Sequence, residues 1–172
     1  MESLKKKVRV ATIIGTWQST LTDFRYLSTE WKKNCEEERL LGVSITGIMD
    51  CNILNGNKKS IDNLPSVLEE LKNVAIQTNK EWAGRLGVNP STAITCVKPS
   101  GTVSQLVDSS SGIHARHNPY YIRTVRANTK DPLCKFMIDK GFPCEPCHLK
   151  PDTTLVFSFP IESPKNAIFR KD

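Results

Sequence analysis

The sequence contains no apolar run approaching the roughly 20 residues that a membrane-spanning helix requires, although 38% of its 172 residues are hydrophobic. Charged residues follow Met1, and no apolar segment with a small-residue cleavage site comes after them, so a secretory signal is not indicated. The sequence also lacks internal repeats and low-complexity segments. These absences predict a soluble, cytoplasmic protein with no membrane partner.

Charge of one sign does not gather in a single block. The formal net charge is +6, but lysine and arginine are spread along the chain, and short clusters such as Lys5–Lys7 are typical of a solvated surface. A nucleotide ligand or solubility explains this charge as well as DNA does, so direct nucleic-acid binding is not expected. The length suits one domain with a core of its own.

Six cysteines are present, and in a cytosolic chain they are expected to be reduced. Cys144, Cys147 and His148 have the Cys-x-x-Cys-His spacing of a haem attachment site, but covalent haem normally requires export. A thiol redox pair should open a helix, whereas these residues lie between Pro143 and Pro151 in a predicted loop. A zinc half-site lacks a second Cys or His pair at suitable spacing. Chance spacing in a proline-rich loop is the fourth interpretation.

Helical and extended patterns alternate along the chain. Apolar spacing predicts helices over residues 8–27, 30–38, 65–87 and 132–140, and buried or alternating runs predict strands over residues 40–48, 93–97, 121–126 and 155–159. Ser28 or Thr29 is expected to cap the second helix, and Gly87 to end the third. This alternation favours an α/β fold with mainly parallel strands and flanking helices.

A tight turn follows the predicted strand 93–97 and leads into a predicted helix start. The glycine lets the backbone approach a ligand, the hydroxyl groups are potential donors, and free N–H groups at a helix start favour an anion. Lys98 adds a cation beside the turn. The candidate phosphate-binding residues are Pro99, Ser100, Gly101 and Thr102. The alternative is an ordinary strand–turn–helix connection with the usual turn residues.

A segment rich in serine and histidine follows this turn at residues 109–117. Its composition suits the wall of a polar pocket, and it also suits a hydrophilic loop with no ligand. His114 and His117 are three residues apart and would form a metal pair only on a helix, against which Gly112 and Pro119 argue. No metal site is predicted.

Several segments together resemble one protein family. They are residues 11–19, 35–47, 98–104, 110–114, 119–126 and 152–160, which include Gly-Val-Ser-Ile-Thr-Gly, Lys-Pro-Ser-Gly-Thr-Val-Ser and Ser-Ser-Gly-Ile-His. In this order they are similar to the adenosylcobalamin-dependent (class II) ribonucleoside-triphosphate reductases of the monomeric type. The resemblance covers nearly the whole chain.

The resemblance implies a ten-stranded α/β barrel, of which residues 1–172 would be a single segment from a later part. Residues 99–102 resemble the loop that holds the substrate phosphates, in agreement with the reading of the turn itself. Two further stretches are similar to those that line the substrate and cofactor cavity. Their candidate lining residues are Ser44, Thr46, Ser110, Ser111, Gly112 and His114.

The resemblance also implies what lies outside the chain. The Cys-x-Glu finger loop with its radical-bearing thiol, the reducible cysteine pair, the effector site, much of the cobalamin site and the C-terminal tail are expected elsewhere. No catalytic residue is therefore assigned here, and the isolated chain is expected to be inactive.

The activity implied for the whole enzyme is reduction of ribonucleoside triphosphates to 2′-deoxyribonucleoside triphosphates for DNA synthesis. Adenosylcobalamin would be its cofactor, a thioredoxin-like protein its reductant, and a second polypeptide a source of the missing barrel. The alternatives are a non-catalytic nucleotide- or phosphate-binding remnant and a small redox or metal protein built on Cys144 and Cys147.

Overall fold

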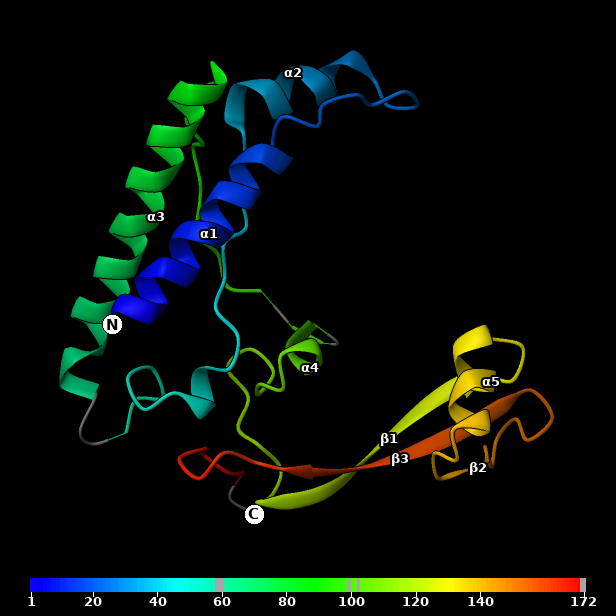
Figure 1. Ribbon diagram of the computed structural model, residues 1–172. Coiled ribbons are helices and arrows are strands. Elements are labelled where there is room, and N and C mark those ends of the chain that lie inside the picture. Colours follow the sequence, from blue (N-terminus) through cyan, green and yellow to red (C-terminus); the bar gives the residue numbers. More distant parts are fainter. Residues whose placement is uncertain (58–60, 99, 102, 171–172) are drawn as a thin grey trace. The chain divides into compact units, whose positions relative to one another are not determined.

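The computed structural model describes residues 1–57, 61–98, 100–101 and 103–170. The chain divides into two compact units, Met1–Ala115 and Arg116–Asp172. The first unit consists of helices and paired extended segments, and the second is a small antiparallel sheet with one helix (Figure 1).

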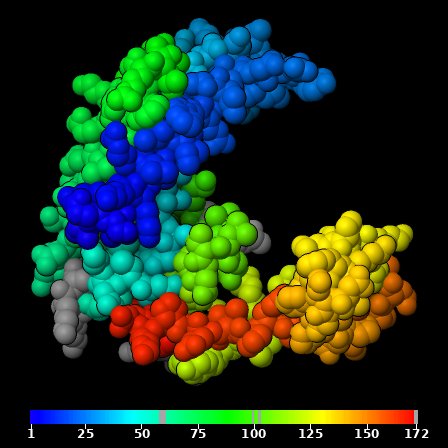
Figure 2. Space-filling model, viewed as in Figure 1, coloured from blue at the N-terminus to red at the C-terminus, as the bar shows by residue number. Residues whose placement is uncertain are grey.

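Two long helices, α1 (Glu2–Gln18) and α3 (Leu64–Leu86), form the body of the first unit. They pack side by side (Figure 1), and the space-filling view shows them in direct contact (Figure 2). Their buried faces follow helical spacing: Val8, Thr12 and Thr16 on α1, and Leu71, Ala75, Thr78, Asn79 and Ala83 on α3. The small alanine side chains at this face let the two backbones come close.

The buried threonines of α1 are compatible with an interior because their hydroxyl groups are satisfied within the helix. Thr12 Oγ1 donates to the Val8 carbonyl at 2.8 Å, and Thr16 Oγ1 donates to the Thr12 carbonyl at 2.7 Å. Asn79 then links α1 and α3, because its Nδ2 donates to Thr16 Oγ1 at 3.0 Å. The apolar core itself is small and centres on Val8, Leu54, Leu71 and Ala75.

The apolar spacing predicted a helix over residues 8–27, but α1 begins at Glu2 and ends at Gln18. It ends at Gln18 because Ser19 and Thr20 turn their hydroxyl groups back onto the Thr16 and Trp17 carbonyls, each at 2.7 Å. These bonds satisfy carbonyl groups that would otherwise need the next helical turn.

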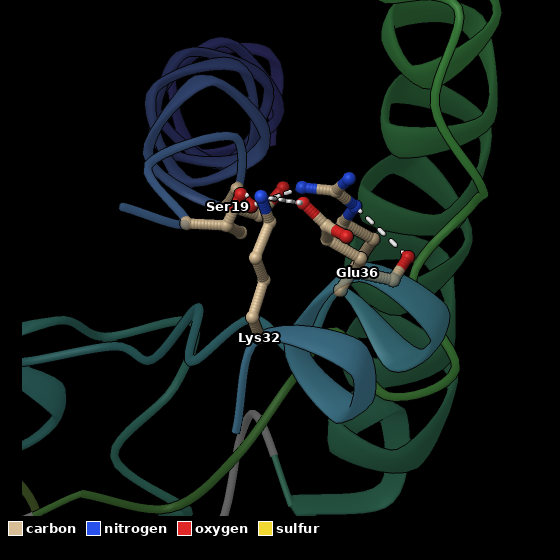
Figure 3. Close-up of polar contacts among 5 residues, drawn as sticks. Ser19, Lys32 and Glu36 are labelled. Atoms are coloured by element: carbon tan, nitrogen blue, oxygen red, sulfur yellow. Dashed lines mark hydrogen bonds and ion pairs between the residues drawn. The ribbon is translucent and has the colours of Figure 1, made fainter. Parts of the chain in front are cut away.

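The second helix, α2 (Thr29–Glu38), begins after Ser28 as predicted, although Ser28 makes no capping bond with its side chain. It ends because Arg39 adopts a left-handed conformation, with φ of 47°. The Arg39 guanidinium donates to the Ser19 carbonyl at 2.6 Å and to the Glu36 carbonyl at 3.1 Å, which ties the end of α2 to the end of α1 (Figure 3). Arg39 thereby fixes the point from which the extended segment 40–48 continues.

Residues 40–48 and 93–97 were predicted as buried strands, and both predictions are wrong in extent and burial. The segments are extended but share only one parallel bridge, Val43 with Thr95, and Val97 is 89% exposed. Short elements follow them: the 3₁₀ turns η1 (Ile48–Asp50) and η2 (Ile61–Asn63), and a four-residue helix, α4 (Val103–Leu106). A helix start after the turn was correctly predicted, but it makes a single turn.

The second unit is a three-stranded sheet of order β1-β3-β2, with strands β1 (Tyr120–Asn128), β2 (Cys144–Pro146) and β3 (Thr154–Glu162). Helix α5 (Pro132–Asp139) follows β1 and begins at Asp131, whose side chain accepts a bond from the Leu133 N–H at 2.8 Å. Phe157 on β3 is 1% exposed and is the largest buried side chain of this unit. The predicted strands 121–126 and 155–159 and the predicted helix 132–140 are confirmed.

The α/β class is confirmed, but the predicted mainly parallel pairing is wrong for the described residues. Strand β3 pairs antiparallel with both β1 and β2, and the parallel bridges among the described residues lie outside the strands. Alternation of apolar residues reveals that a strand forms but not which direction its neighbour runs. The described part of the chain contains no closed barrel.

Candidate functional site

The candidate site lies where the two extended segments of the first unit end. Three backbone bonds hold the segments parallel: Leu41 N to Ala93 O at 2.9 Å, Val43 N to Ile94 O at 2.9 Å, and Cys96 N to Val43 O at 3.1 Å. Parallel pairing sends both segments out on the same side. Residues near 46 and near 100 are therefore brought together.

A cluster of hydroxyl groups forms at this meeting point. Thr46 Oγ1 lies 2.6 Å from Ser100 Oγ and 3.1 Å from the Ser110 carbonyl. The Gly112 N–H points at both hydroxyl oxygens, at 3.0 Å from Thr46 Oγ1 and 2.8 Å from Ser100 Oγ. The Ser111 hydroxyl donates to the Ser100 carbonyl. Three segments far apart in the sequence thus share one polar network.

The serine-rich loop is held in place by η1 and by Gly47, the residue before it. Asp50 Oδ2 accepts the Ser110 N–H at 2.7 Å, and the Gly47 N–H donates to the Ser110 carbonyl at 2.8 Å. Gly47 has φ of +72°, and a Cβ there would lie 2.9 Å from Ser109 Cβ. Only glycine suits this position, since the backbone is left-handed and the loop passes directly over it.

Asp50 was not singled out from the sequence. Its partner is 60 residues away, and no periodicity connects an acidic residue in a short turn to a serine loop so distant. Only the folded chain brings this carboxylate to the site.

A cavity of about 850 Å³ opens beside the network within the first unit. Its walls are mainly apolar and come from α1, α3 and the two extended segments. Ser44, Lys98 and His114 contribute polar groups to it, and Gly112 also borders it. A volume of this size is within the range of sites for small organic ligands, roughly 300–1,000 Å³. A second hollow, of about 470 Å³, is lined by residues at the end of α1, in the loop after it and in α2, among them Ser19, Asn34 and Arg39.

The structure gathers most of the residues that the sequence proposed. Thr46, Ser100, Ser110, Ser111 and Gly112 share one network, and Ser44 and His114 line the cavity beside it. Gly101 is exposed, and a Cβ there would meet nothing within 4 Å. Pro99 and Thr102 lie outside the described residues. The binding role of all these residues stays a prediction.

One atom of the network has no partner. Ser110 is 4% exposed, and its Oγ makes no hydrogen bond to any described residue. Buried hydroxyl groups are normally paired.

The cysteine pair of the second unit is not placed to form a disulfide. Cys144 belongs to the extended strand β2, and the Cys147 N–H continues the pairing with the Thr154 carbonyl at 2.9 Å. Three extended steps separate the two Cα atoms by about 10 Å, beyond the roughly 7 Å limit for a disulfide. Cys144 is exposed and Cys147 is buried. No group of three or more metal-ligating side chains occurs among the described residues.

The Cys147 thiol nevertheless has a distinct environment. The backbone N–H groups of Leu149 and Lys150, and the Arg126 guanidinium, lower the pKa of the Cys147 thiol below its usual range. These groups stabilise the thiolate inside the turn after β2.

None of the helices in the described ranges has the length and apolar character needed to cross a membrane.

Comparison with curated proteins confirms the resemblance drawn from the sequence. The chain is 31% identical over 138 residues to the adenosylcobalamin-dependent ribonucleoside-triphosphate reductase of Euglena gracilis, covering 78% of this chain and 18% of that protein. It is 28% identical over 153 residues to the protein of the same name from Lactobacillus acidophilus, covering 77% and 20%. The chain therefore spans about a fifth of the length of these relatives. No protein-family model matches it.

A solved structure shares the fold. A B12-dependent (class II) ribonucleotide reductase matches 98% of this chain and 26% of its own, with a TM-score of 0.75 and 22% sequence identity. At this identity the likeness establishes the fold of the matching piece and nothing finer.

Proposed function

The chain is a homologue of one segment of the adenosylcobalamin-dependent ribonucleoside-triphosphate reductases, and on this premise we propose that it supplies the substrate-phosphate site and part of the barrel wall of such an enzyme. The complete enzyme would convert ribonucleoside triphosphates to 2′-deoxyribonucleoside triphosphates. Within it, this segment would bind and orient the substrate, while the radical chemistry would belong to the cofactor.

The observation that carries the proposal is the network at Thr46, Ser100 and Gly112. A phosphate group needs several donors converging on its oxygens, and hydroxyl groups and backbone N–H groups are suitable donors. The turn at Ser100 and Gly101 is exposed enough to be reached, and the Lys98 side chain lines the adjoining cavity. Because α4 has only four residues, its dipole contributes little, and the turn and Lys98 would provide the recognition.

Adenosylcobalamin is part of this proposal only for the complete enzyme. When bound, it would supply the radical that starts the reaction. The described residues do not make a whole site for it, because the two hollows, of about 850 and 470 Å³, suit much smaller molecules. The remaining contacts would come from the other four fifths of the enzyme, in the same chain or in a second polypeptide. A thioredoxin-like dithiol would be the reductant of that assembly.

The isolated chain is therefore proposed to bind phosphate without reducing the nucleotide. None of its cysteines lies in a sequence context that matches the radical-bearing thiol of the family. A separate phosphate-binding role, with no reductase around it, would give the same binding and would differ only in the assembled enzyme.

The test is a titration of the chain with inorganic triphosphate and with ATP, followed by NMR shifts up to millimolar concentrations. Gly101→Val is the informative variant. A Cβ at Gly101 meets no described atom within 4 Å, so the fold should accept the side chain while the approach of a phosphate is blocked. We expect a loss of affinity of at least about tenfold, equivalent to about 1.4 kcal/mol.

Gly84→Val is the matched control, since Gly84 on α3 is exposed and also has free space around its Cα. It should leave triphosphate binding unchanged. Equal triphosphate affinity in wild type and a folded Gly101→Val protein would show that the turn at Ser100 and Gly101 does not bind the phosphate.

A further inference from the structure

The hydroxyl of Thr46 occupies the centre of the network. It contacts Ser100, 54 positions later, and Gly112, 66 positions later, at 2.6 and 3.0 Å. Thr46 follows the bridge at Val43, so paired backbone holds it in place. Ser100 instead lies in the turn, and its side chain is fixed by Thr46 and by the Gly112 N–H.

Counting protons shows that this arrangement has two states. The Gly112 N–H supplies one proton to both oxygens, and each hydroxyl supplies one of its own. If Thr46 donates to the Ser110 carbonyl, Ser100 must donate to Thr46, and its proton is used inside the network. If Thr46 donates to Ser100, the Ser100 proton is free to point elsewhere. The Ser110 carbonyl still accepts from the Gly47 N–H at 2.8 Å in that second state.

An anion distinguishes the two states, because a phosphate oxygen accepts hydrogen bonds and donates none when ionised. We propose that Thr46 is a positioning residue, whose hydroxyl holds Ser100 by donating to it so that the Ser100 proton can be given to a phosphate oxygen. This inference rests on the function proposed above. No covalent bond changes in the step; two hydroxyl protons rotate within the network.

The loop does not depend on Thr46 for its place, which makes the proposal testable. The Ser110 N–H is bonded to Asp50 and the Ser110 carbonyl to the Gly47 N–H. Thr46→Val removes the hydroxyl while keeping the branched shape, and these two bonds should keep the loop folded. Thr46→Ser restores the hydroxyl and is the conservative rescue.

The experiment compares the full chain as wild type, Thr46→Val and Thr46→Ser with a matched control, Thr92→Val. Thr92 is exposed and its hydroxyl makes one 3.3 Å bond to the Glu38 carbonyl, away from the network. Amide hydrogen exchange at Gly112 measures the network without any ligand. NMR titration with inorganic triphosphate measures binding.

We expect Thr46→Val to speed exchange at Gly112 by about tenfold and to weaken triphosphate binding by about tenfold, with both restored in Thr46→Ser and unchanged in Thr92→Val. Unchanged exchange in Thr46→Val overturns the role of Thr46 in the network. Faster exchange with unaltered affinity overturns its role in binding and leaves it structural. The proposed function itself fails differently: wild type would then bind no triphosphate.

Discussion

Asn79 should be the most sensitive polar position of the first unit. It is 1% exposed, and it joins α3 to α1 and to the start of the second extended segment. Its Nδ2 donates to Thr16 Oγ1 at 3.0 Å and to Ser91 Oγ at 2.9 Å, while its Oδ1 accepts the Ser91 N–H at 2.9 Å. The substitution Asn79→Ala removes all three bonds.

The magnitude follows from which partners are left unpaired. Each lost bond costs about 0.5–1.5 kcal/mol, and an orphaned buried donor costs about 1–3 kcal/mol. Thr16 keeps its bond to the Thr12 carbonyl at 2.7 Å, and half-buried Ser91 regains some contact with water. We therefore expect a loss of about 2–3 kcal/mol in the free energy of unfolding. For a chain of roughly 150–250 residues this lowers Tm by about 4–12 °C.

Urea unfolding of wild type, Asn79→Ala and Asn73→Ala measures this loss. Asn73 lies on the exposed side of the same helix, so its replacement should change stability by less than about 0.5 kcal/mol. A double-mutant cycle with Ser91→Ala isolates the Asn79–Ser91 coupling. If Asn79→Ala unfolds at the same urea concentration as Asn73→Ala, the idea that Asn79 joins these three segments is refuted.

Two further predictions concern the second unit. Exposed Cys144 should react with a thiol reagent well before buried Cys147, and a mild oxidant should form no Cys144–Cys147 disulfide in the folded chain. Mass spectrometry of the tryptic peptides measures both outcomes. An intramolecular disulfide between these two cysteines would contradict the extended geometry of β2. Phe157→Ala should cost about 3–5 kcal/mol, because this side chain is 1% exposed. Phe136→Ala is its control, since Phe136 is 53% exposed, and equal loss of hydrogen-exchange protection on β3 in both variants would refute the assignment of Phe157 to the core.

Local signals in the sequence predicted α2, α3 and α5 closely, whereas α1 begins six residues earlier and ends nine residues earlier than predicted. Gly87 ends α3 in a left-handed conformation, with φ of +67°, and α5 begins at Pro132, both as expected from residue preferences alone. Strand direction could not be predicted in this way. The pairing of Val125 with Phe157 is a contact between distant residues, and the same alternating pattern would suit either direction.

The sequence predicted most residues of the candidate site but not the hydrogen bonds that join them. Ser100 and Gly101 were proposed because turn residues and hydroxyl groups suit an anion, and Ser110 and Gly112 because their polar segment suits a pocket wall and resembles one in the family. The bond between Thr46 and Ser100 depends on two extended segments meeting, and Asp50 enters only through the loop that folds over η1. Such contacts between distant residues have no periodic signature.

A chimeric enzyme tests the central claim most directly. The segment of the Lactobacillus acidophilus reductase that matches this chain would be replaced by the corresponding residues of this chain, and formation of deoxynucleotide from a ribonucleoside triphosphate would be measured with adenosylcobalamin and a dithiol. The account predicts cofactor-dependent product formation within about tenfold of the parent enzyme, and loss of substrate affinity when Gly101→Val is added. A folded chimera that forms no deoxynucleotide would contradict it.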